Sequence, residues 1–319
     1  MSIEKEDLSL SSQKNVPIIL VTGFFGAGKT TLVKELIKST TKKIGIVEND
    51  LAEINIDGKI LSLTPGNVEI VSNVCICCSK GLHVSEAIDK LLTSQPDIEY
   101  IIIESTGLAN PKNITDNLYA ANIKHGLKVV GICCVVDAKN YFNHSKIKEQ
   151  NQQIIYSDTI IVSKLDLVKD DKHISDINKS LLQLNPTASV KGVINGQISL
   201  DELARFIIAG RYSFIPPSID LGESIHKDIS TFSYTWDKDV KPLKIVMFLK
   251  NFVETGDFIR AKGIFKFPLE PDMYIFQAVE KDVILTQEPG NGTHKSSMVF
   301  IGTSLDKKDI IQKCEDCIL

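Results

Sequence analysis

The chain has 319 residues, of which 43% are hydrophobic and 24% are charged, and its formal net charge is −4. This composition is typical of a globular protein, and the length favours two hydrophobic cores over one. The small negative charge, without a long lysine or arginine cluster, argues against a nucleic-acid partner. The longest apolar run, Val129–Val136, falls well short of the roughly 20 residues that a membrane helix needs, so we expect no membrane partner.

The N-terminal segment, residues 1–15, is polar and lacks the apolar centre of a secretory signal. We therefore expect a flexible segment at the start of a cytoplasmic protein. The seven cysteines occur in small clusters, unlike the disulfide framework of a secreted domain. In a reducing compartment, such clusters indicate metal ligands.

Residues 16–210 alternate short apolar runs with stretches of helical spacing, which is the pattern of a parallel sheet with crossover helices. Most of these runs are apolar throughout, as strands covered on both faces are. The expected strands are Ile18–Thr22, Ile44–Glu48, Val68–Ser72, Tyr100–Glu104, Leu127–Val136, Thr159–Ser163 and Ala188–Val193. The fold class predicted is α/β, a three-layer P-loop domain with a mostly parallel sheet.

A linker is expected at residues 211–225, because Pro216-Pro217 interrupts the periodic pattern. A smaller α+β domain follows at 226–313, and 314–319 are expected to form a tail. The elements expected in this domain are strands Ser230–Trp236, Phe258–Phe267, Met273–Val279 and Met298–Gly302, and a helix over Pro242–Phe252.

The stretch Gly23–Thr30 fits the P-loop pattern G-x-x-x-x-G-K-T and follows an apolar strand, as that motif requires. Its backbone N–H groups can wrap a phosphate, the lysine reaches the terminal phosphates, and the threonine supplies a hydroxyl to Mg²⁺. The competing interpretation is a glycine-rich turn without a ligand. The residues assigned to the nucleotide phosphates are Gly23, Gly26, Ala27, Gly28, Lys29, Thr30 and Thr31.

A second apolar strand ends in Glu104-Ser105-Thr106-Gly107. A carboxylate in this place commonly positions magnesium or water near the terminal phosphate, so we assign Glu104 a catalytic role beside Lys29. Gly107 can let the backbone swing toward a γ-phosphate, which makes the segment a candidate switch. The alternative is a strand-end glutamate with a turn glycine and no such role.

The guanine-reading pattern of P-loop GTPases, N/T/S-K-x-D, appears as Ser163-Lys164-Leu165-Asp166 after another apolar strand. An aspartate carboxylate accepts both the N1–H and the exocyclic amino group of guanine, a donor pair that adenine lacks. Lys164 is expected against the ring face. The short motif is weak alone, but together with the P-loop it favours GTP.

Three thiols lie within four residues in Cys75-Ile76-Cys77-Cys78. Thiolates are soft ligands that suit Zn²⁺ and Cu⁺, and three of them leave a coordination position for a recipient. We therefore predict a site for a transferable metal, zinc first, with copper(I), cobalt and nickel left open. The alternative is a run of small buried hydrophobic side chains.

The P-loop, the cysteine trio, the E-S-T-G strand end and the S-K-x-D motif, in this order, resemble the CobW family of metal-handling GTPases. The resemblance implies a G domain related to the urease and hydrogenase maturation GTPases and a smaller C-terminal domain. It also implies metal binding by Cys75, Cys77 and Cys78. The segment Arg260-Ala261-Lys262-Gly263 is similar to the R-x-K-G element of that family.

The acidic E-N-[DE]-x-[GA] stretch of the family appears here as Glu48-Asn49-Asp50-Leu51-Ala52, with Glu53 following and alanine where glycine is common. The resemblance places Glu48 and Glu53 with the transferred metal and Asp50 with magnesium. A solvated acidic loop is the alternative. The long histidine-rich tract of many members is missing.

Two further cysteine pairs receive weaker interpretations. Neighbours in a strand point to opposite faces, so Cys133 and Cys134 are expected to be core thiols. Cys314 and Cys317 have C-x-x-C spacing near the C-terminus, and accessory metal pick-up and no role are left open.

These motifs lead to a metallochaperone hypothesis: GTP and Mg²⁺ order the metal loops, and hydrolysis lets zinc pass to a client metalloprotein. A homodimer that forms on nucleotide or metal binding is also considered. One alternative is a regulatory GTPase switch with a structural zinc site and a partner-binding C-terminal domain. Another is a small-molecule kinase, which the guanine motif disfavours.

Overall fold

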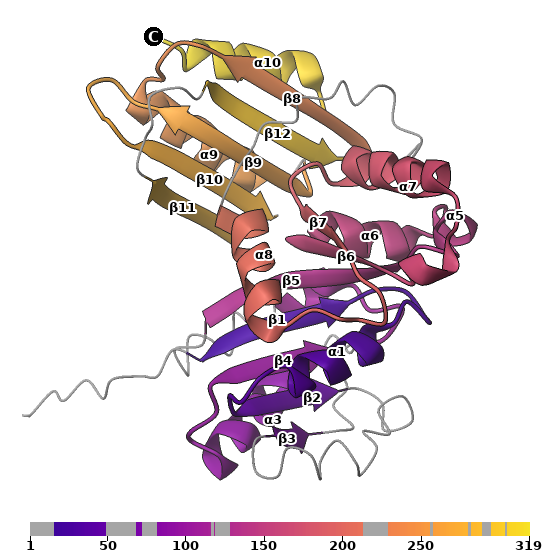
Figure 1. The fold of residues 1–319 in the computed structure, drawn as a ribbon. Coiled ribbons are helices and arrows are strands. Elements are labelled where there is room, and N and C mark those ends of the chain that lie inside the picture. Colours follow the sequence, from indigo (N-terminus) through magenta and orange to yellow (C-terminus); the bar gives the residue numbers. More distant parts are fainter. Residues whose placement is uncertain are drawn as a thin grey trace, which may run out of the picture.

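The structure is a computed structural model that describes residues 16–48, 68–71, 82–115, 118, 128–212, 229–255, 258–279, 282–288, 295–303 and 305–319. Within these residues the chain builds two separate sheets, one of seven strands and one of five (Figure 1). The first sheet is complete before residue 213 and the second begins after residue 229. The predicted fold class, an α/β P-loop domain followed by a smaller α+β domain, is confirmed.

The first sheet is parallel throughout, in the order β3-β2-β4-β1-β5-β6-β7. Its strands are β1 Pro17–Thr22, β2 Ile44–Glu48, β3 Val68–Val71, β4 Tyr100–Glu104, β5 Lys128–Asp137, β6 Thr159–Ser163 and β7 Ser189–Gly192. The helices described around it are α1 Lys29–Lys38, α3 Leu82–Ser94, α5 Tyr141–His144, α6 Lys148–Tyr156, α7 Asp171–Leu184 and α8 Leu200–Tyr212. Because every strand runs the same way, the carboxyl ends of all seven meet at one edge.

Helices cover both faces of this sheet, which gives three layers (Figure 1). On one face, α1 and α8 pack against strand residues such as Ile19. On the opposite face of the sheet, α3 and α6 pack against strand residues that include Ile18. Helix α7 packs beside α6 against β5 and β6. The apolar runs predicted from the sequence are buried on both sides for this reason.

The second sheet is antiparallel and has the order β11-β10-β9-β12-β8. Its strands are β8 Ser230–Trp236, β9 Arg260–Lys266, β10 Met273–Val279, β11 Asp282–Glu288 and β12 Ser296–Gly302. Helices α9 Pro242–Thr255 and α10 Lys307–Asp316 lie on one face over an aromatic core that includes Phe252, Phe265 and Phe300.

Two elements of this second unit, β11 and α10, were not predicted from the sequence. Strand β11 lies at the sheet edge and exposes Val283 and Leu285, so its pattern carries little burial signal. Helix α10 is mostly charged, and it continues past Cys314 into the stretch expected to be a tail. Ile318 then pairs with Val240 in an isolated β-bridge. The tail prediction is therefore wrong there, because two buried cysteines anchor the end of the chain in the core.

A fully buried ion pair joins the two sheets. Arg260 of β9 is 0% exposed, and its Nη2 donates to Oδ1 of Asp158 at 2.8 Å. Asp158 precedes β6 and also accepts from the backbone N–H of Ile132 in β5 at 2.9 Å. Beside it, Lys262 Nζ donates to the carbonyl of Gly210 in α8 at 2.6 Å. The cations of the R-x-K-G segment thus hold the C-terminal sheet against the first domain.

Candidate functional site

The P-loop turns sharply between β1 and α1. Gly23 has φ 143°, and a Cβ there would meet the carbonyl oxygen of Val135 at 2.3 Å, so only glycine fits. Gly26 and Gly28 also have positive φ, 68° and 99°, and Gly28 is the N-cap of α1. The first N–H groups of α1 are therefore presented at the loop, as phosphate binding requires.

The side chains of this loop divide between the core and the open side. Ala27 is buried, while Thr31 is exposed on the first turn of α1. Lys29 is buried as well, and its ammonium donates to the carbonyl of Phe24 at 3.3 Å. A cation held by a loop carbonyl is in position to exchange that partner for a phosphate oxygen.

Glu104 ends β4 beside the P-loop and is buried. Its Oε1 accepts a hydrogen bond from the hydroxyl of Thr30 at 2.7 Å. In the neighbouring strand, Glu48 stands in register with Glu104 and is buried too. The Glu104 carboxylate and the Thr30 hydroxyl are hard oxygen ligands, so this hydrogen-bonded pair fits a magnesium ion.

The loop after Glu104 packs directly on the P-loop. A Cβ at Gly107 would lie 2.7 Å from the backbone nitrogen of Phe25 and 2.5 Å from its ring. Ser105 N–H donates to the carbonyl of Val21 at 3.0 Å, which ties the start of the loop to β1. A movement of Gly107 toward Phe25 would therefore displace the P-loop.

The S-K-x-D motif also contacts the P-loop. Ser163 Oγ donates to the carbonyl of Ala27 at 2.6 Å, and Lys164 Nζ donates to the carbonyl of Gly26 at 2.6 Å. Lys164 has φ 57° and caps a short 3-10 helix, η1 Leu165–Leu167, which leaves Asp166 exposed. The motif is thus fixed to the P-loop, while the Asp166 carboxylate is open to solvent.

Sequence reasoning missed Asp137, which ends β5 next to this motif. Its Oδ2 accepts from Lys164 Nζ at 2.8 Å and from Asn140 Nδ2 at 2.8 Å. Burial raises the pKa of Asp137, but the hydrogen bonds from Lys164 and Asn140 and the charge of Lys164 outweigh burial, so its pKa lies below the ordinary value. A carboxylate directly after the apolar run of β5 was the available signal.

The predicted metal ligands lie mostly outside the described residues. Cys75, Cys77, Cys78, Asp50 and Glu53 all fall in segments that the structure does not describe. In the parts of the chain that are described, no three His, Cys, Asp or Glu side chains gather into a metal site. The prediction of a cysteine site therefore stays a prediction.

The strand cysteines lie in the core as expected. Cys133 packs with α1 and α8, whereas Cys134 packs with α6 and α7 on the opposite face. Burial raises the pKa of Cys134 to about 12, although the charge of Lys29 lowers it slightly. Such thiols do not form the thiolate that binds metal.

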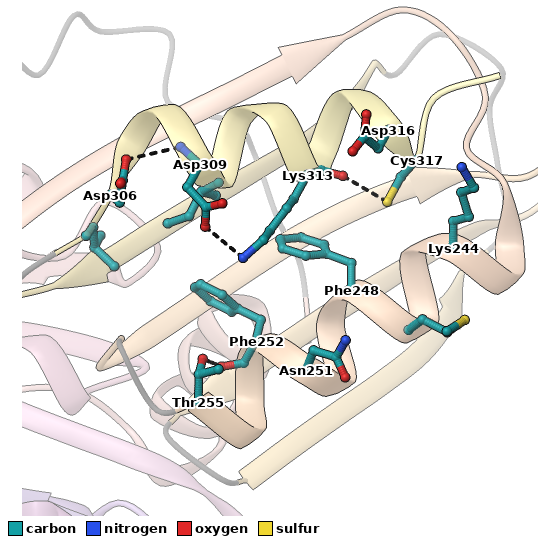
Figure 2. A pocket seen from close by; sticks show the side chains of 13 residues that line it. Lys244, Phe248, Asn251, Phe252, Thr255, Asp306, Asp309, Lys313, Asp316 and Cys317 are labelled. Atoms are coloured by element: carbon teal, nitrogen blue, oxygen red, sulfur yellow. Dashed lines mark hydrogen bonds and ion pairs between the residues drawn. The ribbon is translucent and has the colours of Figure 1, made fainter.

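The C-terminal cysteine pair lies in the packed core of the second unit. Cys314 in α10 and Cys317 at its C-cap are both buried, and burial raises the pKa of Cys314 to about 12. Cys317 donates its thiol to the carbonyl of Lys313 at 3.1 Å and lines a hollow of about 430 Å³ between α9 and α10 (Figure 2). Phe248 and Phe252 line the same hollow, which includes none of the P-loop residues. Packing of the two thiols is what the structure shows, and accessory metal pick-up by this pair stays an untested interpretation.

No helix within the described parts of the chain is both long and apolar enough to cross a bilayer.

Comparisons with known proteins agree with this geometry. The family model of the CobW/HypB/UreG nucleotide-binding domain matches residues 17–191, and that of the cobalamin synthesis protein CobW C-terminal domain matches residues 229–318. These two ranges correspond to the two sheets.

Relatives match along most of the chain. The protein named zinc chaperone YjiA of Escherichia coli is 26% identical over 311 residues, which cover 92% of this chain and 96% of the relative. The zinc-regulated GTPase metalloprotein activator 1 of Schizosaccharomyces pombe is 27% identical over 209 residues, covering 62% of this chain and 50% of that protein. A crystal structure of zinc-bound YjiA GTPase from E. coli has a TM-score of 0.74 at 22% identity, covering 96% of this chain and 99% of that one, and shares the fold.

The P-loop, the Glu104 carboxylate and the S-K-x-D motif therefore lie together at the carboxyl ends of the strands. One family model matches more than half of the chain. The prediction of a GTPase is confirmed. The chain belongs to the CobW/HypB/UreG family of P-loop GTPases and carries the C-terminal domain of CobW proteins.

Proposed function

We propose that this GTPase is a metallochaperone that holds zinc on Cys75, Cys77 and Cys78 and passes it to a client metalloprotein. The observation that carries the proposal is the register of Glu48 with Glu104. Glu48 begins the acidic segment, and Glu104 accepts a hydrogen bond from the hydroxyl of Thr30 in the P-loop. The metal segment and the phosphate segment thus start from adjacent strands.

Strand β3, which precedes the cysteine segment in the sequence, ends at the same edge of the sheet. Strand β3 ends at Val71, four residues before Cys75, and lies three strands from β1. Three strand spacings amount to about 14 Å, and four extended residues reach about the same distance. A thiolate site within reach of the phosphate loop is therefore compatible with the topology.

We assign the nucleotide chemistry to residues whose positions suit it. The P-loop N–H groups and the Lys29 ammonium bind and orient the terminal phosphates, and Asp166 reads the guanine while Lys164 covers its face. Glu104 positions the attacking water, and Gly107 senses the γ-phosphate. Magnesium, held by Thr30, Asp50 or the Glu104 edge, supplies charge neutralisation on the phosphates when bound.

The metal chemistry is assigned to the cysteine trio with Glu48 and Glu53. Zinc prefers four ligands in a tetrahedral arrangement, and three thiolates leave a place for a ligand from the client. The names of the relatives, zinc chaperones and a zinc-regulated metalloprotein activator, support zinc as the cargo. Such a transfer needs reduced thiols, which the cytoplasm maintains.

The test is the zinc content of the purified protein, measured by elemental analysis together with GTP binding. Replacing Cys75, Cys77 and Cys78 by serine should remove bound zinc without abolishing GTP binding, because the P-loop does not include these thiols. A Cys133→Ala variant, which alters a core thiol, is the matched control and should keep its zinc. Zinc retained in full by the triple variant would refute the cysteine site.

A further inference from the structure

Helix α6 carries a buried amide that faces the loop after Glu104. Gln153 is 0% exposed, and its Nε2 donates to the carbonyl of Gly107 at 3.0 Å and to the carbonyl of Ala109 at 3.1 Å. Both partners are carbonyl oxygens, which only accept, so the amide nitrogen must face them. One side chain therefore uses both of its N–H groups to hold this loop.

The held loop is the one that meets the P-loop. Gly107 lies against Phe25 so closely that a Cβ would overlap its backbone nitrogen. A swing of Gly107 toward a phosphate would break the bond from Gln153, or else carry α6 with it. The amide therefore sets both the resting position of Gly107 and the resistance to its movement.

The carboxyl end of α6, just after Gln153, is held by the C-terminal domain. Arg260 Nη1 donates to the carbonyls of Tyr156 at 3.2 Å and Ser157 at 2.8 Å, at the last turn of the helix. A cation at the carboxyl end of a helix is favourable both for the free carbonyls and for the helix dipole. Residues 153–157 of the chain thus link a buried arginine of the second sheet to the loop beside the phosphate site.

We propose that Gln153 is a positioning residue for GTP hydrolysis, and that Arg260 of the C-terminal domain acts on the reaction through it. Gln153 orients the loop of residues 105–109, and Arg260 fixes the helix end from which Gln153 projects. A partner that displaces the C-terminal sheet would thereby change the hydrolysis rate. The inference rests on the proposed role of Glu104 and Gly107 in hydrolysis and is independent of metal transfer.

The first test compares two substitutions on the same helix. Gln153→Met keeps the length of the side chain and removes both donors, whereas Gln150→Met changes a buried glutamine for which the described residues show no bond to the loop. Loss of two hydrogen bonds from a side chain to backbone carbonyls corresponds to a change of about 10- to 30-fold in rate. We expect kcat to fall by that factor in Gln153→Met, with the KM for GTP changed less than about threefold.

In the Gln150→Met control, kcat should stay within about twofold of the unmodified protein. Equal kcat values in the two variants would overturn the assignment of Gln153. Two controls separate a purely structural role. Thermal unfolding measures any destabilisation, and titration with a GTP analogue counts the active sites. Destabilisation alone would lower the number of active sites but not kcat per active site.

The second test asks whether Arg260 acts through Gln153. Arg260→Lys keeps the buried charge but lacks the planar fork that reaches two carbonyls and a carboxylate together. It should lower kcat severalfold alone and have no further effect in the Gln153→Met background. Additive effects of the two substitutions would overturn the relay.

Failure of this inference is distinguishable from failure of the site assignment. Glu104→Gln should lower kcat at least 100-fold if the loop edge is catalytic. Loss of activity in Glu104→Gln with full activity in Gln153→Met would reject the inference alone. Full activity in Glu104→Gln would reject the proposed catalytic edge itself.

Discussion

The buried pair between Arg260 and Asp158 allows one stability prediction to be worked out from the structure. Arg260→Met removes a guanidinium that contacts one carboxylate and two carbonyls, and it leaves the Asp158 carboxylate, whose side chain is 3% exposed, without this cation. Breaking a buried pair by removing one partner costs about 3–5 kcal/mol. We expect a loss of that size in the stability of the C-terminal domain.

The assay is urea unfolding followed by the fluorescence of Trp236, the single tryptophan of the chain, which lies in the core of that domain. Far-UV circular dichroism reports the secondary structure of both domains in the same samples, so its comparison with the Trp236 signal shows whether the two domains unfold together. The matched control is Lys295→Met, which breaks an ion pair whose partners Lys295 and Asp237 are 61% and 68% exposed. A surface pair of this kind contributes about 0–1 kcal/mol.

A double variant separates the buried charge from lost packing. Arg260→Met with Asp158→Asn removes both charges and keeps an oxygen that can accept from the N–H of Ile132. It should recover at least half of the lost stability, because the uncompensated charge is the larger cost. A loss below about 1 kcal/mol in Arg260→Met, equal to the Lys295→Met control, would refute the reasoning.

Three further predictions concern the site and the cysteines. Asp137→Asn keeps the turn acceptors but removes the charge facing Lys164, so the KM for GTP should rise about 3- to 10-fold in steady-state assays. The pKa of Asp137 in the folded protein lies below its ordinary value of 3.8. The Asp137 carboxylate therefore stabilises the fold at neutral pH, and this stabilisation is lost as the pH falls through the lowered pKa. The Asn variant should lack this part of the loss of stability in acid unfolding. Gly107→Ala forces a Cβ onto Phe25, and strain of about 1–3 kcal/mol should lower kcat tenfold or more. An unchanged rate would show that the loop can move away without loss of activity. Cys314→Ser buries a hydroxyl and should cost about 1–3 kcal/mol in urea unfolding while zinc content stays constant; lost zinc would restore a metal role for this pair.

Much of the first domain could be predicted from the sequence because its strands are covered on both faces. Runs such as Ile101–Ile103 carry a strong burial signal, and the observed β4 Tyr100–Glu104 has the predicted bounds. The nucleotide motifs are equally local, since the P-loop and S-K-x-D patterns each lie within eight residues. Physical constraints that act within one short segment are readable from that segment.

The contacts that join distant segments could not be predicted in this way. A glutamine within a helical pattern, such as Gln153, looks like a solvated residue until the loop that it holds is in place. Arg260 and Lys262 stood out only through a family resemblance. Their partners lie far away in the sequence, because Arg260 pairs with the carboxylate of Asp158 and Lys262 donates to the carbonyl of Gly210. Helix α10 was missed because its charged sequence hides the few residues that it buries, Ile310 and Cys314 among them.

The most direct test of the central claim is the zinc affinity of the protein in its two nucleotide states, measured by competition with a chromogenic chelator. One sample contains a saturating non-hydrolysable GTP analogue and the other contains GDP, each with magnesium. A chaperone that uses GTP to control its cargo should show affinities that differ at least about tenfold, a coupling free energy of roughly 1.4 kcal/mol. Equal affinities in the two states would contradict nucleotide-controlled metal transfer.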